Sequence, residues 1–283
     1  MNLYHLSFSN LYVFGDSYCD TGNAFHVTQA TLGGAPNAFG RFCNGSVWVE
    51  FLAKELGLSL QPSTTTVVTE NLNFAFAGAT TGNDNLFCAV IPNLPKLPGL
   101  QQQIEQFLEV LKQNNQVADS EALYIISAGA ADYAPFVNGV PQCTEPQKPI
   151  QNIANAIKTL ASVGAKSILV VNVIDIGRTP LAAAVAEITT AKSVSQAISA
   201  HNQALASLLP TLPSYLNLTL FDAKAILDEI LAEPTKFGFV NTTHACSEAE
   251  AEPEEYVFWD MVHLTRKANQ ILAKAVLNAV FTN

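Results

Sequence analysis

Short runs of apolar residues alternate along the chain with longer segments of helical periodicity. The runs are rich in β-branched and aromatic residues, which is typical of buried strands. They lie at 11–15 (LYVFG), 72–77 (LNFAFA), 123–128 (LYIISA), 167–173 (SILVVNV) and 218–222 (LTLFD). Because each run is apolar at successive positions, both faces of each strand are expected to be buried. The pattern therefore predicts a parallel sheet of five strands with helices on both sides.

The intervening segments place apolar residues at helical spacing. They predict helices over 46–57, 100–111, 150–161, much of 181–209 and the C-terminal segment that follows Thr265. Ser46 and Thr265 are the predicted N-caps of the first and last of these helices, and Gly57 marks the end of the first. We find no internal repeat and no low-complexity linker, so we expect one domain over residues 1–283. Its loop insertions are expected at about 26–45, 82–99, 134–149 and 233–259.

Composition narrows the possible partners. The chain has 283 residues and a formal net charge of −10, and its 14 basic residues are dispersed, which argues against a nucleic-acid partner. No apolar stretch reaches the roughly 18 residues that a transmembrane helix needs, so no stable membrane insertion is expected. The N-terminus lacks the pattern of a secretory signal. We expect a cytoplasmic protein if the chain is complete and a secreted one if a signal has been removed; the oligomeric state is left open.

The five cysteines include no C-x-x-C pair, so the sequence gives no support to a zinc or thioredoxin-type site. We expect mostly reduced thiols. One disulfide among Cys88, Cys143 and Cys246 stays open as an alternative for an exported protein.

Chemically capable residues follow the predicted strands where they end. The first strand ends in Gly15-Asp16-Ser17, and Asp260 lies three residues before His263 ahead of the last helix. Because ligands bind at the carboxyl ends of parallel strands, we expect these residues to share one edge of the sheet. A serine hydroxyl needs an imidazole to take its proton, and the imidazole needs an acceptor to orient it. The sequence therefore predicts Ser17 as nucleophile, His263 as general base and Asp260 as its partner.

Several segments that are spread over nearly the whole chain resemble motifs of the GDSL (SGNH) family of serine esterases and lipases, in the branch found among plants and bacteria. They are FGDSYCDTGN (14–23), GRFCNGSVWVEFLA (40–53), NFAFAGATTG (73–82), GAADY (129–133), GFVNTTHAC (238–246) and FWDMVHLT (258–265). The resemblance implies a three-layer α/β/α, flavodoxin-like domain and the same three catalytic residues. Tyr18 stands where the family usually has leucine, and we expect it to affect packing more than chemistry.

The resemblance also implies an oxyanion hole formed by the backbone N–H groups of Ser17 and Gly78 and by a side-chain amide. The amide normally comes from a Gly-x-Asn-Asp motif, but Ala131 occupies the asparagine position here. Losing one such donor typically costs roughly 10²–10³ in kcat, so turnover is expected to be impaired. A deliberate substitution is the explanation that we favour, and natural divergence with a compensating donor is the alternative.

These observations predict a carboxylic ester hydrolase that works through a serine acyl-enzyme and needs no cofactor. The mostly apolar loops at 86–100 and 134–141 favour short to medium acyl or aryl esters as small-molecule substrates. Acyl transfer to an alcohol, deacetylation of carbohydrates and ester binding with weak turnover stay open as alternatives.

Four other polar residues are expected to be structural. Asp16 and Asp20 could be mistaken for the carboxylate pair of a glycosidase, but we expect them to accept hydrogen bonds from nearby backbone amides. Asn23 and Arg41 are expected to brace the loop behind the nucleophile.

Overall fold

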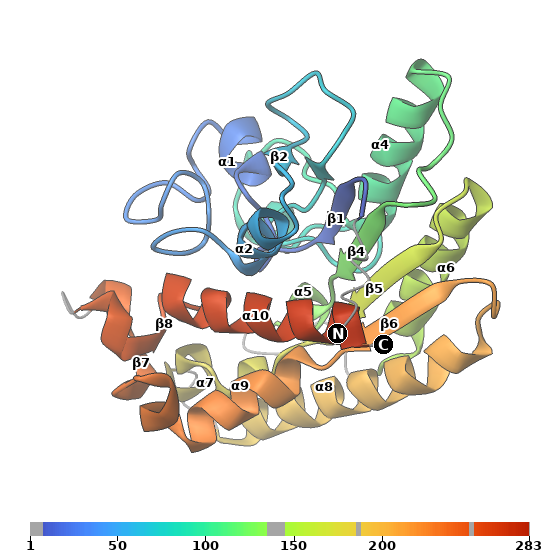
Figure 1. The fold of residues 1–283 in the computed structure, drawn as a ribbon. Helices are drawn as coiled ribbons and strands as arrows, with labels where there is room; N and C mark the ends of the chain where they lie inside the picture. The colour runs from blue at the N-terminus through green and yellow to red at the C-terminus, as the bar shows by residue number, and fades with distance from the viewer. Residues whose placement is uncertain (1–7, 135–144, 185–187, 249–251, 283) are drawn as a thin grey trace.

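A six-stranded parallel sheet forms the centre of the protein, in a computed structural model that describes residues 8–134, 145–184, 188–248 and 252–282 (Figure 1). The strands are β1 (Leu11–Gly15), β2 (Gln61–Pro62), β3 (Leu72–Asn73), β4 (Leu123–Ser127), β5 (Ser167–Val171) and β6 (Asn217–Phe221), in the order β2-β3-β1-β4-β5-β6. Val13 of β1 pairs with Asn73 on one side and Ile125 on the other. Strand β1, which precedes Ser17, therefore lies inside the sheet.

The predicted count of five strands was wrong, because the edge strand β2 has two residues and includes a proline. So short a segment shows no apolar run. The second predicted strand, 72–77, is also shorter than expected. After Asn73 the backbone still donates to β1, through Phe74 N to Val13 O at 2.7 Å. On the side away from β1, however, a side chain and not a strand bonds this segment. Asn23 Nδ2 donates to the carbonyls of Asn73 and Ala75, at 2.7 and 3.0 Å.

Helices cover both faces of the sheet, which confirms the three-layer prediction. They are α1 (Asn23–Val27), α2 (Trp48–Glu55), α3 (Leu86–Val90), α4 (Leu100–Gln113), α5 (Ala130–Tyr133), α6 (Gln147–Ser162), α7 (Pro180–Ala184), α8 (Ile188–Leu208), α9 (Ala223–Ala232) and α10 (Arg266–Thr282). Leu11 and Val13 pack in a core with α2, α9 and α10, whereas Tyr12 and Phe14 pack in a second core with α4 and α6. In the described residues, none of these helices is both long and apolar enough for a membrane span.

Two of the predicted helix ends are confirmed and one is corrected. Gly57, with φ +71°, follows α2, and Thr265 Oγ1 accepts the N–H of Ala268 at 3.4 Å at the start of α10. The N-cap of α2 is Val47 rather than Ser46. The Glu50 carboxylate accepts the Val47 N–H at 2.9 Å, so the first turn is satisfied without a serine hydroxyl.

The expected loop at 233–259 contains a parallel pair of strands, β7 (Asn241–Ala245) and β8 (Tyr256–Phe258). Strand β7 is largely polar, so no apolar run in the sequence indicates a strand there. Its partner strand also lies more than ten residues away. Segment 82–99 likewise includes α3, and 26–45 consists mainly of turns after α1. Within 134–149, residues 135–144, with Cys143, lie outside the described residues. Short 3-10 turns occupy Ile176–Arg178, Leu209–Thr211, Pro234–Phe237, Cys246–Glu248 and Pro253–Glu255.

Gln103 of α4 fixes the end of β1 from outside the sheet. Its Oε1 accepts the Gly15 N–H at 2.8 Å and its Nε2 donates to the Gly15 carbonyl at 2.9 Å. The side chain is fully buried, so water cannot replace it. The N–H of Gly15 therefore depends on this amide, whereas the Gly15 carbonyl also accepts from Phe76 N at 3.1 Å.

Replacing Gln103 with methionine is expected to lower the free energy of unfolding by about 1–3 kcal/mol, because the Gly15 N–H loses its partner in the interior. Urea unfolding followed by circular dichroism measures the change. Gln106→Met makes the same substitution on the exposed side of α4 and should change stability by less than about 0.5 kcal/mol. Equal effects of the two variants would contradict this role of Gln103.

Candidate active site

Strand β1 delivers Ser17 to the carboxyl edge of the sheet through a tight turn. A Cβ atom on Gly15 would lie 2.2 Å from the carbonyl oxygen of Ser127, so this position requires glycine. The Asp16 N–H donates to that same carbonyl at 3.2 Å, and the Asp16 carbonyl accepts from Asp20 N at 3.0 Å. The turn is therefore held against β4 by backbone hydrogen bonds, with Ser17 at its tip.

The second half of the site is the turn between β8 and α10. Trp259 N donates to the carbonyl of His263 at 2.8 Å, which closes the turn. The Asp260 carboxylate accepts the backbone N–H groups of Val262 and His263, at 2.9 and 2.8 Å. Thr265 starts α10 directly afterwards and donates its hydroxyl to the Tyr256 carbonyl at 2.8 Å. The aspartate therefore organises the same turn that carries the histidine.

The structure brings the three predicted side chains into one hydrogen-bonded chain. Ser17 Oγ lies 2.7 Å from His263 Nε2, and His263 Nδ1 lies 2.7 Å from Asp260 Oδ2. Burial alone would raise the pKa of Asp260, but attraction to His263 and three hydrogen bonds outweigh it and lower the pKa below the ordinary value. Asp260 therefore carries the negative charge that orients and stabilises an imidazolium. The arrangement can transfer the proton of Ser17 to His263.

Ser17 and His263 line a pocket with an empty volume of about 420 Å³. Its walls are mainly apolar and include Leu86, Phe87, Ala134, Ile176 and Val262. The first three belong to the loops at 86–100 and 134–141 that the sequence places over the edge of the sheet; residues 135–141 of the second loop lie outside the described residues. The pocket therefore offers apolar surface beside the serine hydroxyl.

The predicted oxyanion-hole positions line this same pocket. Gly78 has φ +79°, and a Cβ atom there would lie 2.6 Å from both Asn85 Oδ1 and the Phe87 ring, so glycine is required. In the described part of the chain, the N–H groups of Ser17 and Gly78 donate to no protein acceptor. They are available to an oxyanion in the pocket.

Ala131 also lines the pocket, from the first turn of α5, and it is 7% exposed. Its methyl group cannot donate a hydrogen bond. Among the described residues that line the pocket, none is an asparagine or glutamine. No described lining residue therefore supplies an amide in place of the expected one.

Asp20 is structural, as the sequence predicted. Its buried carboxylate accepts three N–H groups from residues 22–24 of its own loop, at 2.7–3.1 Å, and a fourth from Ala77 at 2.8 Å. Because Ala77 precedes Gly78, this carboxylate joins the loop after β1 to the loop that carries Gly78, a predicted oxyanion-hole position.

Asn23 braces the loop behind the nucleophile as expected, whereas the hydrogen bonds of Arg41 go to its own loop and to α2. Asn23 Nδ2 donates to the carbonyls of Asn73, at the end of β3, and of Ala75, just beyond it. Arg41 pairs with Glu50 through two hydrogen bonds, at 2.9 and 2.6 Å. Arg41 thereby joins its loop to α2.

The pairing of Asp132 with Thr81 was not predicted. The Asp132 carboxylate accepts both the N–H and the hydroxyl of Thr81, at 2.9 and 2.8 Å. Both residues lie in segments that the sequence singles out, GAADY and NFAFAGATTG, but 51 positions separate them and no local signal shows their contact. The pair holds α5, with Ala131, against the loop that follows Gly78.

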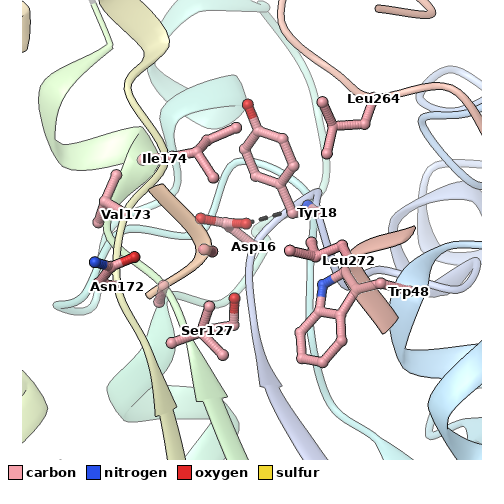
Figure 2. Close-up of a pocket in the computed structure, with 13 residues that line it drawn as sticks. Asp16, Tyr18, Trp48, Ser127, Asn172, Val173, Ile174, Leu264 and Leu272 are labelled. Atoms are coloured by element: carbon pink, nitrogen blue, oxygen red, sulfur yellow. Dashed lines mark hydrogen bonds between the residues drawn. The ribbon is translucent and has the colours of Figure 1, made fainter. Parts of the chain in front are cut away.

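A second pocket, with an empty volume of about 390 Å³, shares Asp16, Tyr18 and Ala130 with the first. Figure 2 shows the Asp16 carboxylate among the side chains that line this pocket, bonded to the backbone N–H of Tyr18. The remaining lining includes Val173, Ile174 and Leu272. No group of three or more His, Cys, Asp or Glu side chains suited to a metal ion lies within the described residues.

The family described as GDSL-like lipase/acylhydrolase matches residues 11–276. The chain belongs to this family. Membership confirms the resemblance inferred from the sequence motifs, and with it the class of esterases and lipases.

Relatives whose names indicate different activities match the chain. Thermolabile hemolysin from Vibrio parahaemolyticus is 25% identical over 94% of this chain, which spans 62% of the hemolysin. Phosphatidylcholine-sterol acyltransferase from Aeromonas hydrophila is 30% identical over 85% of this chain and 66% of that relative. GDSL esterase/lipase APG from Arabidopsis thaliana is 27% identical over 100% of this chain and 95% of that protein.

Solved structures share the fold. A member of the lipolytic G-D-S-L family from Veillonella parvula superposes with a TM-score of 0.50 at 14% identity, over 95% of this chain and 96% of that one. At this identity the likeness supports the fold alone.

Stability should depend on pH through Asp16. Burial raises the pKa of this carboxyl from 3.8 to about 7, against the hydrogen bond from Tyr18 and the attraction of His263. Between about pH 4 and pH 7 the folded protein therefore holds a proton that the unfolded chain has released, so this carboxyl's contribution to stability falls as pH rises through that window. The free energy of unfolding of the wild type relative to Asp16→Asn should decrease over this range and level off above it.

Asp119→Asn is the matched control for this measurement. Burial would raise the pKa of Asp119, but hydrogen bonds from Ser9 and Asn10 outweigh it and lower the pKa below 3.8. Its contribution to stability is lost only at more acidic pH, so the wild-type advantage over this variant should stay constant from about pH 4.5 to pH 7.5. Parallel curves for the two variants would show that Asp16 does not titrate as described.

Proposed function

We propose that this chain hydrolyses carboxylic esters through an acyl-enzyme on Ser17, with His263 as general base and then acid and Asp260 as its orienting partner. The observation that carries the proposal is the continuous hydrogen-bonded chain from Ser17 Oγ through both nitrogens of His263 to Asp260. Its position in a pocket with apolar walls supports an ester rather than a charged substrate.

The geometry supports a two-step reaction. Ser17 Oγ attacks the ester carbonyl while His263 Nε2 takes its proton, and the negative charge on the carbonyl oxygen is met by the N–H groups of Ser17 and Gly78. His263 then protonates the departing alkoxide, which leaves the acyl group on Ser17. Water enters, loses a proton to His263 and attacks the acyl carbonyl, so that the acid departs and Ser17 regains its hydrogen.

Two features support short to medium acyl or aryl groups as the preferred acid part. Leu86 and Phe87 of α3 and Ile176 form apolar walls around the nucleophile, and the Phe42 ring stacks on Phe87 with centroids 5.9 Å apart. Free sugars would find few polar partners on these walls. This argues against an acetylated carbohydrate as the main substrate.

Acyl transfer to an alcohol is the second candidate, and the acyltransferase named among the relatives favours it. Transfer uses the same acyl-enzyme and differs in whether an alcohol or water accepts the acyl group. An added alcohol that is converted to a new ester would distinguish transfer from hydrolysis.

A hydrolysis panel tests the proposal. Wild-type protein should cleave p-nitrophenyl esters of short to medium acyl chains with a higher kcat/KM than it shows for acetylated xylan. Ser17→Ala and His263→Ala should each lower kcat by at least about 10⁴-fold, because either change removes the activated nucleophile. A strong preference for acetylated xylan would contradict the proposed substrate class, and full activity of Ser17→Ala would exclude the acyl-enzyme.

Ala131→Asn is expected to raise kcat by about 10²-fold and to change KM far less, because the amide acts on the charge that develops in the transition state. Steady-state kinetics with the best ester of the panel measures both constants. Ala130→Asn places the same amide on the preceding residue of α5, which also lines the pocket, and should give no such gain. An unchanged kcat for Ala131→Asn would count against an oxyanion role for this position.

A further inference from the structure

Tyr18 joins the two turns that carry Ser17 and His263. Its backbone N–H donates to Asp16 Oδ1 at 3.1 Å within the nucleophile turn. Its hydroxyl donates to the carbonyl oxygen of Val262 at 2.8 Å, across 244 positions of sequence. Figure 2 shows the ring between Ile174 and Leu264, with Asp16 beside its backbone. One end of this residue is therefore fixed beside the nucleophile and the other beside the base.

The hydroxyl of Tyr18 bonds the peptide that leads directly into His263. The carbonyls on either side of Val262 have other partners: Met261 O accepts from Leu181 N of α7, and His263 O accepts from Trp259 N, both at 2.8 Å. In the described part of the chain, the Tyr18–Val262 bond is the one hydrogen bond besides Ser17–His263 that links the two turns.

The ring of Tyr18 also packs against the imidazole, with centroids 5.3 Å apart. Phe42 packs against His263 as well, at 5.1 Å. Burial, followed by the charges of Asp16 and Asp260, raises the pKa of the Tyr18 phenol well above its ordinary value. The phenol therefore stays protonated and remains a donor to Val262 at neutral pH.

We propose that the Tyr18 hydroxyl is a positioning group that holds the His263 turn at the distance from Ser17 that proton transfer requires. The inference rests on the proposed function, since it assigns a role within the same Ser17–His263 pair. The leucine that the family usually has at this position carries no hydroxyl and cannot make the bond. Tyr18 would then contribute to catalysis in this chain rather than to packing alone.

The rate at which a fluorophosphonate labels Ser17 tests the proposal without depending on the choice of ester. In this reaction Ser17 Oγ attacks phosphorus, His263 takes the serine proton and fluoride departs. Tyr18→Phe removes one oxygen atom and keeps the ring. We expect it to lower the second-order labelling rate and the kcat for a p-nitrophenyl ester by about tenfold, with KM nearly unchanged, since small displacements of a catalytic group reduce rate strongly.

Tyr124→Phe is the matched control. Tyr124 lies on the neighbouring strand β4, and its hydroxyl donates to the Asp119 carbonyl at 2.9 Å, away from the pocket. The same loss of a phenol–carbonyl bond should lower the melting temperature but leave the labelling rate unchanged. Tyr18→Leu introduces the residue that the family usually has and also removes the hydroxyl, so it should label as slowly as Tyr18→Phe. It replaces Tyr18→Phe in the test if that variant folds poorly.

A double variant shows whether Tyr18 acts through the imidazole. In a His263→Ala background, Tyr18→Phe should cause no further decrease in the residual labelling rate, because the group that it positions is absent. A further decrease of similar size would overturn the proposal, as would wild-type labelling and kcat in folded Tyr18→Phe. Wild-type protein that fails to label at Ser17 would overturn the proposed function and this inference with it.

Discussion

The hydrogen bond from Ser17 to His263, 2.7 Å long between residues 246 positions apart, is the contact on which the site depends. The rest of the fold holds its two ends in place. Strand β1 is buried along its whole length between β3 and β4, and it carries Ser17 to a fixed point. Helix α10 anchors the other end and packs on α2, where Asn269 Oδ1 accepts the Trp48 N–H at 3.1 Å. The layered core therefore determines the distance between nucleophile and base.

Two buried carboxyl groups and a partly buried third position the loops around that contact. Asp16, Asp20 and Asp132 each accept backbone N–H groups, and burial raises their pKa values to about 7, 6 and 6. A buried carboxylate is costly to ionise, and several N–H donors offset that cost. By accepting these N–H groups, each carboxyl group holds a segment of backbone near the pocket in place. These carboxyl groups hold backbone in place, and the proposed proton transfer is assigned to His263 instead.

One of the three predicted oxyanion-hole positions, Ala131, has no side-chain hydrogen-bond donor. The serine, histidine and aspartate form an unbroken hydrogen-bonded chain, and Ser17, Gly78 and Ala131 line the pocket beside it. Ala131 has a methyl group at the position where the resemblance leads us to expect an amide. Proton transfer and charge stabilisation are separate physical tasks. The structure shows the geometry that the first task needs, and Ala131 supplies no side-chain donor for the second.

The sequence by itself determined the main local elements and identified the candidate reacting groups. Apolar runs and helical spacing marked the main strands and helices, and Gly-Asp-Ser at a strand end with Asp260 three residues before His263 marked the chemistry, because these signals lie within a few neighbouring residues. The tertiary structure alone decided what joins distant segments. No periodic pattern in the sequence indicates four of these features: the edge strand β2, the β7–β8 pair, the contact of Gln103 with Gly15 and the bond from Tyr18 to Val262. Each depends on how close the packed core brings two segments that are distant in sequence. A local pattern carries no information about the distance between such segments.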